Sequence, residues 1–206
     1  FIDRDGYPFC RGRIFDVVEK DCGQYDTVTE VMWVTGAALF IRLADYREVG
    51  GLDGHFFAHM EEIDLCWRLR SRGKKLVCIP QSVVYHVGGA TLKKENPRKT
   101  FLNFRNNLLM LYKNLPDKEL EHVLFIRGIL DRVAALVFYL KKDRANARAV
   151  MQARREFEDI RYSFAASRIE NMMKSTDEII PERTHFSIVM KYYLLGKKHF
   201  SQLKLF

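Results

Sequence analysis

The chain has 206 residues, of which 48% are apolar and 29% are charged, and this globular composition excludes a largely disordered chain. With 12 glycines and 5 prolines, it is also unlike collagen and low-complexity sequences. The positive charge lies in the second half, because residues 1–92 contain 11 basic and 13 acidic residues, whereas residues 93–206 contain 23 and 13. A basic half of this kind predicts either a solvated helical surface or a surface that faces an anionic membrane, nucleic acid or an acidic partner.

The cysteines and the start of the chain give two further expectations. None of the four cysteines belongs to a Cys-x-x-Cys pair, which favours reduced thiols over a zinc or redox motif. The chain starts at Phe1 rather than Met and shows no basic-then-apolar leader, so we expect a fragment or a processed product.

The first half predicts strands and helices in alternation. Short apolar runs at residues 31–34 and 38–41 predict buried strands, and residues 43–49 predict a short helix. Residues 60–72 predict a longer helix, because acids stand at its start, arginines crowd its end and Gly73 follows. Two more strands are predicted at residues 76–79 and 83–87. This order favours an α/β layer over a helical bundle.

The second half predicts helices only, at residues 100–114, 123–140, 146–174 and 188–195. The helix at 123–140 is the most apolar, but Arg127, Asp131 and Arg132 interrupt it, so it is a poor transmembrane span.

The strongest local signal is the acidic group Glu61, Glu62 and Asp64 at the start of the predicted helix 60–72. Such a group is typical of a general base or a metal site, or else of an ordinary helix N-terminus. Because the three carboxylates repel one another, at least one of their pKa values should be raised.

Three other features are weaker candidates. His86, at the end of a predicted strand, predicts a metal or phosphate contact or a structural histidine. Trp33, with Gly36 and Ala37, predicts a platform for a sugar or acceptor, or else a buried indole beside a turn. The Asp-x-Asp pattern at Asp3 is interpreted as a turn.

Taken together and in order, these motifs resemble the C-terminal half of family 2 glycosyltransferases, and among them the rhamnosyltransferase-like branch. The match spans roughly residues 30–115. It consists of these segments: Trp33-Val34-Thr35-Gly36-Ala37, Phe40-Ile41-Arg42, Val49-Gly50-Gly51-Leu52-Asp53, Phe56-Phe57, Glu61-Glu62-Ile63-Asp64-Leu65-Cys66-Trp67-Arg68-Leu69, Gly73, Ile79-Pro80, Val84-Tyr85-His86-Val87-Gly88-Gly89 and Phe104-Arg105-Asn106-Asn107-Leu108-Leu109.

The resemblance implies a GT-A fold and an inverting transfer of a sugar from a nucleotide-sugar donor to a polysaccharide or lipid-linked glycan. The family's Glu-Asp-x-Asp motif falls on residues 61–64, so Glu62 stands where the family base is usually Asp, and Asp64 is the alternative base. The resemblance places the substrate-side residues at Trp33, Gly36, Ala37 and Arg68. It implies that His86 contacts the metal or the diphosphate.

Nothing in the sequence matches the family's N-terminal half, which binds the nucleotide and a divalent metal. We therefore expect an incomplete GT-A-like mixed α/β sheet in residues 1–115, followed by a basic α-helical extension in residues 116–206. We expect Mg²⁺ or Mn²⁺ only together with the absent half, and we expect no sugar transfer by this chain alone.

The basic second half leads to expectations about partners. Residues 93–206 predict peripheral contact with the inner face of the cytoplasmic membrane, or else oligomerisation or packing on the catalytic half, in a cytoplasmic protein. The main alternative function is a non-catalytic module that binds glycan or a partner chain. Nucleic-acid binding is disfavoured, because the basic half has no zinc-finger or RNP pattern.

Overall fold

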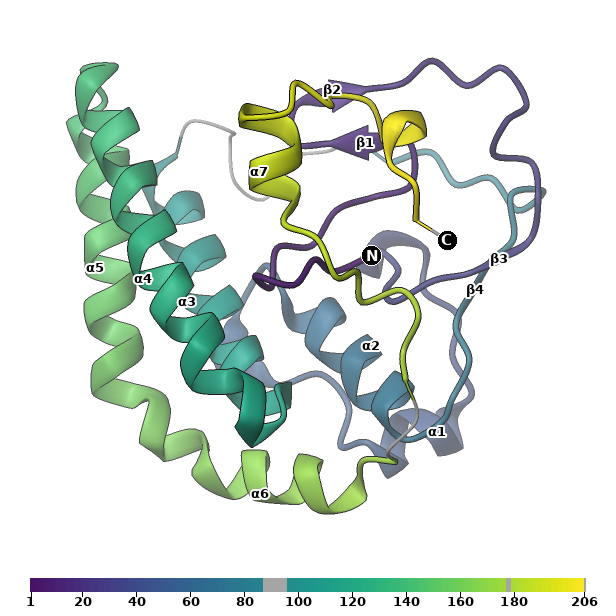
Figure 1. Cartoon of the computed structure of the whole chain (residues 1–206). Coiled ribbons are helices and arrows are strands. Elements are labelled where there is room, and N and C mark those ends of the chain that lie inside the picture. The colour runs from purple at the N-terminus through teal and green to yellow at the C-terminus, as the bar shows by residue number, and fades with distance from the viewer. Residues whose placement is uncertain (87–95, 177–178, 206) are drawn as a thin grey trace.

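Three long helices stand side by side along one edge of the molecule (Figure 1). The computed structural model describes residues 1–86, 96–176 and 179–205. The three helices are α3 (Pro97–Asn114), α4 (Asp117–Leu140) and α5 (Arg144–Ile160). Because short connections join them, α4 runs antiparallel to both neighbours, and α5 packs along α3 in parallel.

The core lies where α2 (Glu61–Ser71) packs against α3. Trp67 on α2 is 2% exposed, and it belongs to one hydrophobic cluster with Leu108 and Leu111 of α3 and Phe157 of α5. Behind α2, the short helix α1 (Leu43–Glu48) leads into a second, smaller cluster. The helices predicted at 43–49, 60–72 and 100–114 are thus confirmed.

The start of α3 shows why the helix begins earlier than predicted. The Asn96 side chain accepts a hydrogen bond from the backbone N–H of Arg98 at 2.9 Å, and Pro97 occupies the first helical position. Both are strong helix-start signals, because they satisfy or remove N–H groups that lack partners in the first turn.

The strands are fewer and shorter than predicted. β1 (Arg13–Ile14) pairs with β2 (Val17–Val18), and β3 (Thr29–Glu30) pairs with β4 (Val77–Cys78), both antiparallel. The prediction of a strand at 76–79 is confirmed at its centre. The prediction at 31–34 is wrong, because β3 ends just before it.

Two further strand predictions are also wrong. A 3-10 turn over Gly36–Ala38 replaces the start of the strand at 38–41, and Phe40 is 89% exposed. Residues 83–86 are exposed and irregular, and the rest of that prediction falls outside the described residues. Helices and two small antiparallel pairs are compatible with the α/β class, whereas the GT-A sheet stays a prediction.

The end of the chain returns to its start. The helix predicted over 146–174 is interrupted by a 3-10 turn at Arg161–Phe164, after which α6 (Ala165–Lys174) crosses beneath the helical layer. Within this turn the Ser163 hydroxyl donates to the Ile160 carbonyl at 2.7 Å, a local bond that competes with the helical ladder. Residues 182–184 then pair with the backbone of Ile2, before α7 (Ile188–Tyr193).

The helices beyond residue 115 therefore pack directly on the first part of the chain. Arg168 of α6 donates to the Leu115 carbonyl at 2.8 Å at the end of α3. The division into segments 1–115 and 116–206 stays a prediction.

Two of the charged side chains that interrupt the apolar sequence of α4, Arg127 and Asp131, point into the protein interior. Arg127 and Asp131 are 1% and 0% exposed and form an ion pair of 3.2 Å, and Arg154 of α5 donates to the second oxygen of Asp131 at 2.8 Å. Arg127 also donates to the side chain of Asn107 on α3. No helix in the described part of the chain is long and apolar enough to cross a membrane.

Candidate active site

The acidic residues at the start of α2 point to different sides of the helix. Each residue turns the α-helix by about 100°, so Glu62 and Asp64 lie about 200° apart around its axis. Glu62 is half-buried and faces a cleft, whereas Asp64 is 0% exposed and faces the core. The two candidate bases therefore sit in different chemical surroundings.

The cleft beside Glu62 has a volume of about 260 Å³. Trp33 and Glu62, which the sequence singled out separately, both line it, together with Arg13, His59 and Asn103. The indole N–H of Trp33 donates to the Phe1 carbonyl at 2.8 Å, which fixes the ring beside the cleft. A carboxylate, a fixed aromatic ring and several polar side chains thus share one concave site, which is the usual composition of a ligand pocket.

The surroundings of Glu62 favour the protonated form of its carboxyl group, as suits a side chain that accepts a proton. Burial raises the pKa of its carboxyl group, and the charge of neighbouring Glu61 raises it further. Its Oε2 atom is buried and has no hydrogen-bond partner among the described residues. The prediction that at least one pKa of the acidic group is raised is thus confirmed in direction.

Asp64 belongs to a buried ionic network. Its Oδ2 accepts from Lys113 at 2.9 Å and lies 2.9 Å from the guanidinium of Arg68, and its Oδ1 accepts from Asn114 at 2.7 Å. Lys113 also donates to Asp53 at 2.8 Å. With both oxygens occupied and no exposed surface, Asp64 is placed to hold α2 on α3 rather than to meet a substrate.

The same network fixes the loop before α2. Burial works to raise the pKa of Asp53, but the bond from Lys113 and other contacts outweigh it and lower the pKa to about 2. Arg68 donates to the Gly51 carbonyl at 2.7 Å and also to the Val49 carbonyl. Arg68 is 5% exposed, so the structure places this predicted substrate residue in the interior, on the face of α2 away from the cleft.

The other predicted site residues lie in several places. Gly36 lies next to Glu62, because a Cβ atom added to Gly36 would be 3.8 Å from the Glu62 Cβ. Ala37 is exposed on the same 3-10 turn and does not line the cleft. Glu61 is half-buried with an unpartnered Oε2, but it also lies outside the cleft lining. His86 is exposed.

Sequence reasoning missed His59. It lines the cleft, its buried Nε2 has no hydrogen-bond partner among the described residues, and burial lowers its pKa. Its backbone has φ of 71°, and Phe57 and Met60 have φ of 63° and 73°. Three non-glycine residues in this sparsely populated region make a strained loop, a feature that clusters at functional sites.

Asn106 of α3 holds this loop in place. Its side-chain nitrogen lies 2.9, 2.8 and 2.8 Å from the carbonyl oxygens of Phe56, Ala58 and His59, which share its two N–H donors, and Asn106 is fully buried. The Arg-Asn-Asn segment that ends the family resemblance thus has a physical role. It anchors the strained loop that carries His59 and leads into Glu62.

Replacing Asn106 with alanine is therefore expected to lower the free energy of unfolding by about 2 kcal/mol, since the amide has two N–H donors and each net hydrogen bond contributes about 1 kcal/mol. Urea unfolding of the variant measures this loss. The half-buried Asn103, on the same helix, is the matched control, and Asn103→Ala should change stability by less than about 0.5 kcal/mol. Equal losses in both variants would show that the three loop bonds do not stabilise the fold.

The described residues do not form a metal site by themselves. No three His, Cys, Asp or Glu side chains within residues 1–86, 96–176 and 179–205 gather closely enough to hold an ion. Asp3 is used in a turn, as predicted: it accepts hydrogen bonds from the backbone N–H groups of Asp5 and Tyr7 at 3.0 and 2.7 Å.

Comparison with known proteins finds glycosyltransferases. No family model matches the chain, and no solved structure matches it. A pre-mycofactocin glycosyltransferase of Mycobacterium tuberculosis is 31% identical over 141 residues, which cover 63% of this chain and 29% of that protein. The rhamnosyltransferase WbbL of Escherichia coli K12 is 33% identical over 69 residues, which cover 34% of this chain and 25% of that protein.

A third relative points the same way. An N-acetylglucosaminyl-diphospho-decaprenol L-rhamnosyltransferase of Mycobacterium tuberculosis is 38% identical over 56 residues, covering 27% of this chain and 18% of that protein. The matched part of this chain spans less than a third of the length of each of these relatives. The chain is therefore similar to glycosyltransferases over part of their length, with relatives that include rhamnosyltransferases.

Proposed function

We propose that this chain supplies the acceptor side and the catalytic base of an inverting family 2 glycosyltransferase, with Glu62 as the base. The observation that carries the proposal is the placement of Glu62: it has a raised pKa and an unpartnered buried oxygen, in a cleft shared with Trp33. The similarity to glycosyltransferases supplies the class of reaction.

The chemistry needs this chain to accept one proton. The Glu62 carboxylate takes the proton of an acceptor hydroxyl, and the hydroxyl oxygen attacks the anomeric carbon of the donor sugar. The bond between that carbon and the diphosphate oxygen breaks, and the nucleoside diphosphate leaves with the electron pair. A base whose pKa is raised toward the working pH is well matched to this step.

The other cleft residues position the acceptor in this proposal. The fixed indole of Trp33 offers an apolar face for a sugar ring, while its N–H is already bound to the backbone. Gly36, beside Glu62, leaves room for the acceptor because it has no side chain. His59 also lines the cleft, and its buried ring nitrogen has no hydrogen-bond partner among the described residues, so a small shift of the ring would let it bind a sugar hydroxyl.

The names of the relatives support a proposal for the substrates. Two of the three relatives are rhamnosyltransferases, and one acts on a diphospho-decaprenol-linked sugar. We therefore propose a nucleotide-activated sugar as donor, and a growing polysaccharide or lipid-linked glycan of the cell envelope as acceptor. The expectation of Mg²⁺ or Mn²⁺ needs ligands beyond those that the structure describes, and no step above passes through a metal.

The pH dependence of transfer tests this assignment. Because a base acts only when ionised, kcat/KM of the complete gene product that contains this chain should fall as the pH drops through the raised pKa of Glu62. The midpoint of this acidic limb is expected above the ordinary range of a glutamate. Glu61→Gln should move the midpoint to lower pH, because it removes the negative charge that raises the pKa of Glu62.

The profile also has outcomes that would contradict the proposal. A midpoint in the ordinary glutamate range, unmoved by Glu61→Gln, would exclude Glu62 as the titrating base. Strong transfer by the 206-residue chain alone would contradict the expectation that the donor site lies outside it.

A further inference from the structure

The outer face of α4 carries a row of apolar side chains that nothing in the described structure covers. Six of them, spaced three, four or seven residues apart along one side, are between 43% and 70% exposed. They are Phe125, Ile129, Val133, Leu136, Val137 and Leu140. The inner face of the same helix holds the ion pair of Arg127 and Asp131. A surface helix usually turns its apolar side chains inward and its charges outward, and this stretch of α4 does the opposite.

The end of this row is strongly basic. Residues 132–155, from the second half of α4 into α5 as far as Arg155, contain seven Lys or Arg residues and one acid. That acid, Asp143, accepts from the backbone and side chain of Asn146 and so serves as the cap of α5. Arg154 is paired with Asp131 of α4, and the other six basic residues of the segment far outnumber its one acid, so this end keeps a strong positive charge.

Apolar and basic side chains meet in a groove between the two helices. The groove has a volume of about 740 Å³, and Leu136, Tyr139, Arg144, Arg148 and Arg155 line it. We call these five residues, together with the adjacent Leu140, the hairpin surface. Figure 1 shows the turn between α4 and α5 projecting at one extreme of the molecule, where a flat partner has access to it.

We propose that the hairpin surface docks on the anionic leaflet of a membrane. A surface that combines exposed apolar side chains with arginines matches the interface between lipid tails and anionic headgroups. Charge complementarity favours this occupant over a second copy of the chain, because self-association here would bring two strongly positive surfaces together.

The location of the hairpin surface suits an acceptor that is anchored in lipid, a point that rests on the proposed function. α3 starts at the same end of the helical layer as the α4–α5 turn, and Asn103 near that start lines the cleft of Glu62. Docking by the turn would therefore place the cleft on the membrane side of the molecule. Vesicle binding itself requires no catalysis, so its failure and the failure of the proposed function are distinguishable.

The test is co-sedimentation of the full chain with vesicles of phosphatidylcholine, with and without phosphatidylglycerol, at low salt. We expect binding only to the anionic vesicles, and weaker binding as added salt screens the charges. The triple variant Arg144→Gln, Arg148→Gln, Arg155→Gln should lower the partition coefficient roughly 100-fold. Leu136→Ser with Leu140→Ser, which keeps the charge, should lower it by at least about tenfold.

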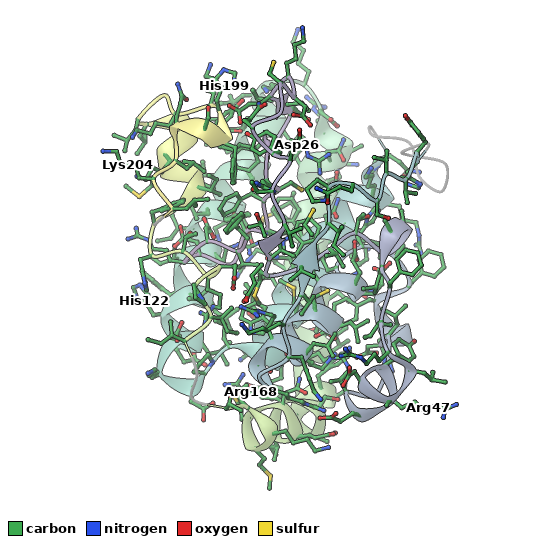
Figure 2. The ribbon with its side chains drawn as sticks, turned by 90° about the vertical axis from the view of Figure 1, so that its right-hand side faces the viewer. Asp26, Arg47, His122, Arg168, His199 and Lys204 are labelled. Carbon is green, nitrogen blue, oxygen red and sulfur yellow. The ribbon has the colours of Figure 1, made fainter. Side chains whose placement is uncertain are left out.

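A control variant removes the same charge elsewhere. Arg47, Lys198 and Lys204 are exposed, and Figure 2 shows Arg47 and Lys204 projecting outward at opposite corners of the molecule. Changing all three to glutamine should leave vesicle binding close to that of the parent chain. Loss of binding in this control, or binding to neutral vesicles alone, would overturn the proposal. Dissociation of a dimer by the leucine variant, measured by light scattering, with no change in vesicle binding, would instead assign the surface to self-association.

Discussion

Changing Glu62 to glutamine is expected to lower the kcat of the complete gene product by about 10²–10⁴-fold, the usual contribution of a general base. Glutamine keeps the size of the side chain but cannot accept the hydroxyl proton. The raised pKa of Glu62 means that the folded state disfavours its ionised form, so at neutral pH the variant should be as stable as the parent or more stable. Steady-state transfer assays and urea unfolding of the same samples measure both effects.

Two neighbouring variants make this result specific. Glu62→Asp introduces the residue that the proposed family 2 assignment implies at this position, and it should retain most of the activity that Glu62→Gln loses. Glu61→Gln, one residue away and outside the cleft lining, should keep kcat within about tenfold of the parent at high pH. Full activity in Glu62→Gln would show that Glu62 is not the base and would favour a role for this chain as a binding module.

Changing Asp64 to alanine is expected to lower the free energy of unfolding by about 3–5 kcal/mol, the usual effect of breaking a buried ion pair. Asp64 and Asp53 balance the charges of Lys113 and Arg68, and all the bonds among them are 2.8–3.0 Å long. Without Asp64, Arg68 stays buried without a carboxylate partner, and the Asn114 amide loses one of its two acceptors and keeps only the Met110 carbonyl. Urea unfolding measures the loss.

A double-mutant cycle separates this network from a general packing defect. Asp64→Asn with Lys113→Met removes one negative and one positive charge, so the pair should be less destabilised than the sum of the single variants, by about 1–3 kcal/mol. Glu62→Gln is the control for loss of an acid on the same helical turn. Strict additivity of the two changes, or a negligible loss in Asp64→Ala, would contradict the structural role of Asp64.

The helices could be predicted because their signals are local. The acids, arginines and Gly73 around residues 60–72, and the apolar spacing of residues 100–114, depend only on neighbours within a few positions. The strands predicted at 31–34 and 38–41, and the described part of the one predicted at 83–87, are absent, because strands depend on distant neighbours. An apolar run becomes a strand only when another strand lies beside it, and Phe40 shows that the second run is not even buried.

The site was predictable in part. The motif identified Glu62 and Asp64 as alternative candidates for the catalytic base. A helix, however, places residues two positions apart on nearly opposite sides. Combining the helix predicted at 60–72 with that rotation separates the cleft residue from the core residue. The partners of Asp64 could not be found this way, because Lys113 and Asn114 lie 49 and 50 positions away in the sequence.

The most direct test of Glu62 as the catalytic base is a crystal structure of the complete gene product with an acceptor sugar bound. We expect the reacting hydroxyl to lie about 3 Å from a carboxylate oxygen of Glu62, with the sugar ring against Trp33. Glu62 would not be the base if the acceptor bound outside this cleft. The same would follow if Asp64 held the hydroxyl after the Lys113 network had opened.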